Sequence, residues 1–177
     1  MKKKVLMIIS IVLFLSVLFF TYFFFFVKKE ERLISNFEEC VLAGYPVIET
    51  YPRQCSYNNS FFAEDIGNEK EKLDLIFVNN PRPNDKIESP LFISGEARGF
   101  WFFEASFPIY LKDEKGEVIS YAIATAKSDW MTENFVPFEA EIVFEKPESQ
   151  KGELVFLKDN PSGLKEYDDE LVIPVRF

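Results

Sequence analysis

Carboxylates are the side chains of this chain with the most capacity for chemistry, because its 177 residues include no histidine. Histidine is the usual general base and a common metal ligand, and nucleophilic triads depend on it. Its absence excludes Ser-His-Asp and Cys-His mechanisms. A hydrolase could still use acids such as Glu104 and Asp129, but that requires a buried carboxylate with a raised pKa. We assign no catalytic residue, and the sequence favours a protein that is not an enzyme.

A second group of acids lies near the carboxyl end. The loop 159–163 reads DNPSG, and Glu166, Asp168, Asp169 and Glu170 follow it. Together these residues could offer oxygen ligands to Ca²⁺. Their spacing matches no calcium loop, and charge runs near strand ends usually keep sheet edges soluble. We therefore assign neither a metal nor a cofactor.

Aromatic residues offer a different kind of candidate site. In an extended strand, Phe100 and Phe102 would face one side, and Trp101 and Phe103 the other. Sandwich strands normally have one solvated face, so the extra aromatic face is a candidate partner surface. The alternative is an interior strand that other parts of the chain cover. Trp130, which follows an aspartate, is either a sugar-stacking or a core residue. The candidate surface is Phe100, Trp101, Phe102 and Trp130.

The only two cysteines, Cys40 and Cys55, lie in a segment of residues 36–66 with 14 residues between them. Metal binding would need further ligands at close spacing, and no CxxC pair is present. A disulfide is the simplest use, and closing such a loop contributes roughly 3 kcal/mol in the chain-entropy model. It persists only in an oxidising compartment; the alternative is two free thiols in the cytosol. Turns on both sides of a short strand at 47–50 predict a small clasped β-hairpin.

An apolar stretch at the amino terminus predicts a membrane anchor. Residues 5–27 carry no charge, and as a helix they would span roughly 34 Å at about 1.5 Å per residue. A cleaved signal peptide is the alternative, but it needs a shorter apolar region and small residues before the cut. Basic residues flank both ends, so the disulfide decides the orientation. We expect a cytoplasmic tail at 1–4 and everything after the helix outside the cytoplasm.

The charge of the chain is unevenly distributed. The formal net charge is -9, and the first 32 residues hold six basic against two acidic side chains, so the remainder carries -13. A domain this acidic is repelled by phosphate backbones and anionic headgroups. A nucleic-acid partner is therefore excluded.

Residues 67–72, GNEKEK, have the composition of a solvated linker, which places a boundary before a domain at 73–177. Beyond it, short runs of strand-forming residues alternate with Gly, Pro, Asn and Asp turns. This spacing predicts an all-β, immunoglobulin-like antiparallel β-sandwich. The expected strands are 73–78, 91–97, 100–105, 108–112, 118–126, 138–145, 153–157 and 171–176.

Several separated motifs carry a family resemblance. They include Gly95, Gly99, Trp101, Asp129-Trp130, the 159–163 loop and the closing Ile173-Pro174-Val175. In this order they resemble the Gmad2 family, the immunoglobulin-like domain associated with the spore germination protein GerM, over residues 75–177. The resemblance implies an extracytoplasmic bacterial domain without established catalytic residues. The usual neighbouring domain is replaced here by the apolar stretch and the cysteine module, so a sporulation role does not follow.

The sequence as a whole predicts a single-pass membrane protein of the bacterial envelope. Its amino terminus would be cytoplasmic, and its outer domain would bind an envelope protein or a cell-wall polymer. The alternatives from other classes are an envelope hydrolase that uses carboxylates and a purely structural spacer. Paired carboxylates in a cleft would favour the enzyme.

Overall fold

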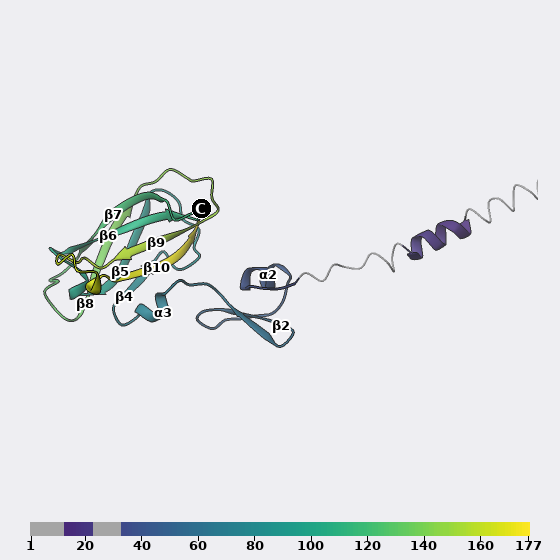
Figure 1. Cartoon of the computed structure of the whole chain (residues 1–177), viewed down its shortest axis with the longest axis horizontal. Coiled ribbons are helices and arrows are strands. Elements are labelled where there is room, and N and C mark those ends of the chain that lie inside the picture. Colours follow the sequence, from purple (N-terminus) through teal and green to yellow (C-terminus); the bar gives the residue numbers. More distant parts are fainter. Residues whose placement is uncertain (1–12, 23–32) are drawn as a thin grey trace, which may run out of the picture. The chain divides into compact units, whose positions relative to one another are not determined.

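Residues 13–22 and 33–177 are described from a computed structural model of the chain (Figure 1). Residues 13–22 are helical. The predicted tail (1–4) and both ends of the predicted membrane helix (5–27) lie outside the described residues. Within the described residues, no helix has both the length and the apolar character needed to cross a membrane. Asn36–Phe177 form one compact unit.

This unit consists of a cysteine-clasped module followed by a β-sandwich. The elements of the module are α2 (Phe37–Leu42), β1 (Val47–Ile48), β2 (Gln54–Tyr57) and β3 (Ser60–Ala63). The elements of the connection and the sandwich are α3 (Glu69–Lys72), β4 (Ile76–Asn80), β5 (Leu91–Arg98), η1 (Gly99–Trp101), β6 (Ser106–Asp113), β7 (Val118–Ala126), β8 (Phe135–Ile142), β9 (Lys151–Leu157), η2 (Lys165–Tyr167) and β10 (Glu170–Arg176).

The sandwich is antiparallel and closes nearly into a barrel. Within residues 36–177, seven strands pair in the order β10-β9-β6-β7-β8-β5-β4. In this region β7 and β8 share two residue pairs, at Thr125 and Ala126, whereas β5 and β8 pair along their whole length. The sheet therefore folds over at the β7–β8 contact and encloses one core. Phe107, Phe138 and Phe156 are fully buried in it.

Alternating side chains explain why these segments are strands. In β6, Phe107, Ile109 and Leu111 are buried, and the residues between them are partly exposed. A strand places successive side chains on opposite faces, so this period-two pattern puts one face on the core. The antiparallel all-β fold predicted from the sequence is confirmed. The bounds of β7 agree with the prediction, whereas β8 begins three residues before the predicted start.

The predicted strand at 100–105 is wrong. The chain forms the 3₁₀ turn η1, and a two-residue reversal between Phe103 and Ser106 follows it. Glu104 and Ala105 at the tip have φ of 49° and 62°, as this tight hairpin turn requires. A Cβ at Gly99 would lie 2.0 Å from the carbonyl oxygen of Thr132, so only glycine lets the turn approach this loop.

The segment 67–72 differs from the solvated linker that its composition predicts. It contains the short helix α3, and Glu69 within it is fully buried. Asn68 also caps the outer edge of β10, where its side-chain oxygen accepts from the Val172 amide at 2.7 Å. An uncovered edge strand offers free backbone groups to other chains, so this contact protects the sheet. The compact unit Asn36–Phe177 extends across the predicted boundary.

The module is more elaborate than the hairpin predicted from the sequence. Its described residues contain the helix α2 and a three-stranded sheet in the order β1-β2-β3. Asn36 caps α2 by accepting from the Glu39 amide at 2.9 Å, which the isolated sequence pattern did not reveal. The predicted disulfide is confirmed: it joins Cys40 on α2 to Cys55 on β2, and both residues are fully buried.

Candidate functional site

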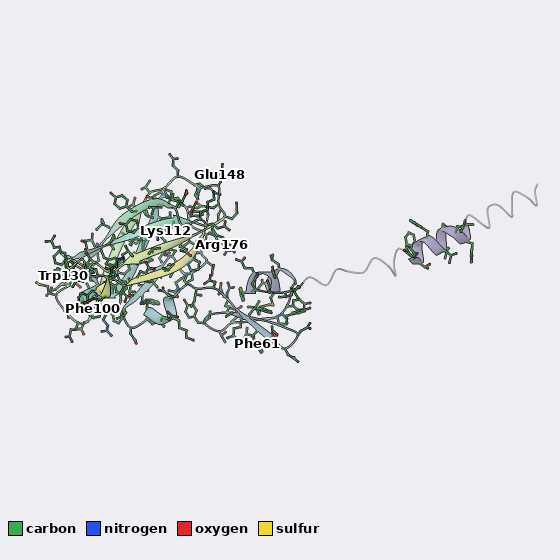
Figure 2. All side chains as sticks on the ribbon, viewed as in Figure 1. Phe61, Phe100, Lys112, Trp130, Glu148 and Arg176 are labelled. Carbon is green, nitrogen blue, oxygen red and sulfur yellow. A yellow bond between two sulfur atoms is a disulfide. The ribbon has the colours of Figure 1, made fainter. Side chains whose placement is uncertain are left out.

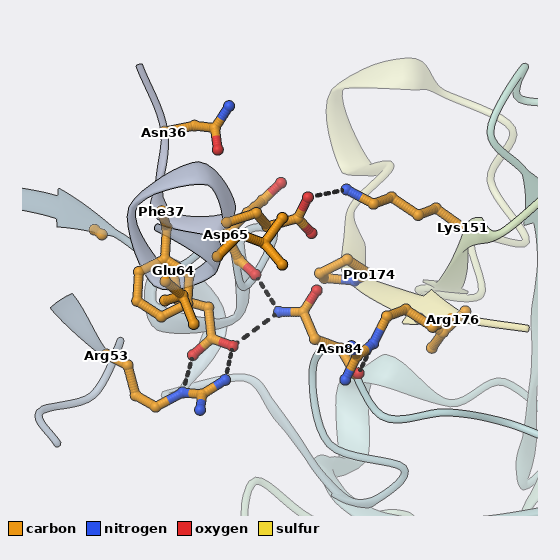
Figure 3. Close-up of a pocket in the computed structure, with 14 residues that line it drawn as sticks. Asn36, Phe37, Arg53, Glu64, Asp65, Asn84, Lys151, Pro174 and Arg176 are labelled. Carbon is orange, nitrogen blue, oxygen red and sulfur yellow. Dashed lines mark hydrogen bonds and ion pairs between the residues drawn. The ribbon is translucent and has the colours of Figure 1, made fainter. Parts of the chain in front are cut away.

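A groove of about 630 Å³ lies where the clasped module meets the sandwich (Figure 3). One wall is α2, where Phe37, Val41 and Leu42 supply apolar surface. The other wall is the end of β10, with Pro174 and Arg176. The groove therefore combines an apolar wall with charged side chains, which is the composition expected of a binding site.

The disulfide positions the apolar wall. Val41 and Leu42 directly follow Cys40, which is bonded to Cys55 in the three-stranded sheet. The exposed fraction is 41% for Val41 and 82% for Leu42, so both side chains are accessible beside the buried bridge. A helix of six residues is not stable alone in water, so α2 depends on tertiary contacts, and the bridge is its covalent one.

Glu64 connects the module to the sandwich at the floor of the groove. Arg53 donates to both of its carboxylate oxygens, at 2.8 and 2.6 Å. Asn84, from the sandwich side, donates its side-chain amide to Glu64 at 3.3 Å and to the carbonyl oxygen of Asp65 at 2.6 Å. The hydrogen bonds from Arg53 hold the pKa of Glu64 below its ordinary value, and burial opposes this only partly. The carboxylate is therefore charged at neutral pH.

The substitution Glu64→Gln is expected to lower the free energy of unfolding by about 1 kcal/mol at pH 7, because Arg53 is half-exposed and solvent weakens the pair. A lowered pKa contributes stability that is present above the ordinary value of about 4.3 and is lost as the pH falls through the folded value. Urea unfolding of both proteins between pH 7 and 3 should show the difference shrinking. Glu88→Gln, in an exposed pair with Lys86, is the control. A difference that is constant with pH would contradict the role of Glu64.

Arg82 makes a second connection. It donates to both carboxylate oxygens of the buried Glu69, at 2.6 and 3.1 Å, and to the hydroxyl of Tyr51 in the module at 2.7 Å. It also donates to the carbonyl oxygen of Val78. Burial raises the pKa of Glu69, and the pairing with Arg82 opposes this. Glu69 does not line the groove, so this pair is structural.

Two cations belong to the sandwich wall of the groove. Lys151 on β9 and Arg176 on β10 are register partners, so their side chains leave the same face of the sheet. Lys151 crosses to Glu38 on α2 at 2.6 Å, while the Nε of Arg176 donates to the carbonyl oxygen of Asn84 at 2.7 Å. Figure 3 shows both side chains reaching the groove from the sandwich. Among the described residues, no carboxylate pairs with Arg176.

The structure does not bring the four predicted surface aromatics together on one accessible face. Trp101 and Phe102 are core residues with exposed fractions of 0% and 3%, so their assignment to a partner surface is wrong. The physical reason is that η1 turns both rings inward, whereas a strand would have alternated them. Phe100 is half-exposed, and Trp130 is partly buried against the core. Figure 2 shows these two at the same end of the sandwich.

Comparison with known proteins gives one family. The sequence model of Gmad2, described as the immunoglobulin-like domain of bacterial spore germination, matches residues 75–164. The chain belongs to the Gmad2 family. No curated protein and no solved structure matches it. The matched part of the Gmad2 domain contains Asn84 and Lys151 of the groove, whereas the clasped module and Arg176 lie outside it.

The carboxylates considered for catalysis do not form a paired site. Glu104 lies at the tip of the Phe103–Ser106 reversal and Asp129 in the β7–β8 connection, and both are exposed. Asp129 accepts from the Met131 amide at 3.0 Å, which is a local turn contact. The alternative envelope hydrolase would need a buried acid in the groove. Glu69 is a fully buried acid, but it does not line the groove.

The acidic loop of the Gmad2 domain is held by its own side chains. Asn160 donates to the carbonyl oxygen of Leu164 at 2.8 Å and to the carboxylate of Asp168 at 2.7 Å. Among the described residues, no group of three or more acids or cysteines is arranged to hold a metal ion. These internal hydrogen bonds therefore hold the loop in its observed conformation.

Sequence reasoning missed the residues of the groove. Arg53, Glu64, Asn84, Lys151 and Arg176 come from distant parts of the chain. The one local signal was the pair of cysteines, which indicated that the module has a fixed shape. Nothing in the sequence indicated that Asn84 bonds to the module, because this contact depends on how the two parts fold together.

Proposed function

We propose that this chain is a binding protein of the bacterial cell envelope, anchored by residues 5–27, whose ligand site is the groove between the clasped module and the Gmad2 domain. The groove supports this proposal most, because it combines an apolar wall, which a disulfide fixes within the module, with Arg176 of the sandwich, which has no carboxylate partner among the described residues. The family is described as a domain of spore germination, and that description names no enzymatic activity.

The chemistry of the module supports a compartment for the proposed site. Its disulfide persists where the environment is oxidising, which favours a location of the module and the Gmad2 domain outside the cytoplasm. The uncharged stretch of residues 5–27 would hold them at the membrane. A partner in this compartment would be an envelope protein or a cell-wall polymer. The charge of -13 after residue 32 disfavours a polyanionic partner.

Substitution at the lip of the groove tests the proposal. The full-length chain in detergent, carrying Leu42→Arg, should bind isolated bacterial envelopes roughly tenfold more weakly than the unchanged chain. Leu42 is the most exposed apolar residue of the wall, and a charged side chain there would both obstruct the groove and remove apolar contact. Co-sedimentation measures the bound fraction.

Leu164→Arg is the matched control, because Leu164 is half-exposed and lies outside the groove. This variant should bind as the unchanged chain does. Equal binding by Leu42→Arg and the unchanged chain would contradict the groove as the binding site. Loss of binding in both variants would indicate a different surface or a general effect of added charge.

A further inference from the structure

We infer that the groove takes the free carboxylate of a peptide between Lys151 and Arg176, with the apolar side chains of the peptide against the α2 wall. This inference rests on the proposed function and specifies its ligand. Like charges directly opposite each other in a sheet repel, and Lys151 and Arg176 are such a pair. An anion between them relieves this repulsion.

Of the two cations, Lys151 has a carboxylate partner among the described residues and Arg176 has none. Glu38 reaches across the groove to Lys151 at 2.6 Å, but both side chains are about half-exposed. Such a pair contributes little stability, so an incoming carboxylate can replace Glu38 at small cost. Arg176 stays without a carboxylate partner among the described residues, and its Nε is fixed by the Asn84 carbonyl oxygen. A guanidinium held in this way presents its remaining N–H groups to a planar, two-oxygen acceptor.

The rest of the groove favours a peptide over inorganic phosphate. Glu38, Glu64 and Asp65 also line it, and these acids oppose a doubly charged phosphate more than a single carboxylate. The groove is also lined by the apolar side chains of Val41 and Leu42, which a phosphate ion would leave uncovered. A peptide that ends in apolar residues offers one negative charge at its carboxylate. Its last side chains are apolar and lie directly beside that charge.

Three probes test the inference on the full-length chain in detergent: acetyl-Ala-Leu-Leu with a free carboxylate, the same peptide as the carboxamide, and inorganic phosphate. Binding is followed by the NMR amide signals of Lys151 and Arg176. The acid should bind roughly tenfold or more tightly than the carboxamide, since a hydrogen bond to a charged group is lost. Arg176→Gln should weaken binding of the acid by a similar factor.

Glu38→Gln gives a prediction of opposite sign. It removes the internal competitor for Lys151, so the acid should bind roughly two- to fivefold more tightly. A merely structural role for Glu38 would not strengthen binding. Lys127→Gln is the control, because Lys127 pairs with Glu139 away from the groove. This variant should bind the acid as the unchanged chain does.

Equal binding of acid and carboxamide, no binding of either peptide, or tighter binding of phosphate would each overturn the carboxylate inference. The envelope experiment with Leu42→Arg is independent of these probes. If Leu42→Arg loses envelope binding while the peptides fail, the groove remains the binding site and the ligand class is wrong. If Leu42→Arg binds envelopes normally, the proposed function itself fails.

Discussion

Replacing Trp101 by alanine is expected to lower the free energy of unfolding by about 3–5 kcal/mol, the usual cost of removing a large buried aromatic side chain. Trp101 is fully buried in the core that the sandwich encloses. The loss combines the transfer of the ring from water with the cavity that remains. Urea unfolding of the full-length chain in detergent, followed by circular dichroism, measures it.

Phe100→Ala is the matched control, one residue away. Phe100 is half-exposed, so its removal should cost less than about 1 kcal/mol. The indole nitrogen of Trp101 has no hydrogen-bond partner among the described residues, so Trp101→Phe should cost less than the alanine variant. Similar stability losses for Trp101→Ala and Phe100→Ala would contradict the conformation of η1.

Removing the disulfide is expected to lower the free energy of unfolding by about 3 kcal/mol, through the loop entropy that the unfolded chain regains. The double variant Cys40→Ala/Cys55→Ala leaves α2 attached mainly by its apolar contacts and by the Glu38–Lys151 pair. Because α2 is one wall of the groove, envelope binding should fall with it.

Hydrogen exchange measures this change by region. In the double variant, the amides of α2 and β2 should lose protection, while those of β6 and β7, far from the bridge, serve as the internal control and retain it. The chain has only these two cysteines, so a reducing agent should reproduce the effect in the unchanged protein. Unchanged protection of α2 would show that the bridge does not hold the groove wall.

The fold could be predicted because its signals are local. The alternation of Phe107, Ile109 and Leu111 gives both the strand and the face that it buries. The disulfide followed from having only two cysteines, with no histidine nearby to suggest a metal site.

The errors have a common origin in tertiary contacts. Four consecutive aromatic residues suit a strand, but Gly99 and the tight turn at Glu104 and Ala105 rotate Trp101 and Phe102 inward. The charged segment around Glu69 suits a linker, but Arg82, 13 residues later, pairs with its carboxylate and allows its burial. Local composition does not show such partners.

The groove was beyond sequence reasoning for the same reason. Lys151 and Arg176 become neighbours only through the register of β9 with β10, and Glu38 reaches them only because α2 is clasped to β2. Each residue alone is an ordinary surface charge. Their juxtaposition is what suggests a binding site.

Photo-crosslinking from position 42 tests the groove as the envelope-binding site most directly. A photoreactive amino acid replaces Leu42 in the full-length chain in living bacteria, and a second strain carries it at Leu164, which lies outside the groove. We expect a discrete crosslinked product from position 42 that is absent from position 164 and that disappears in the double cysteine variant. Equal products from both positions, or none from position 42, would contradict binding in the groove.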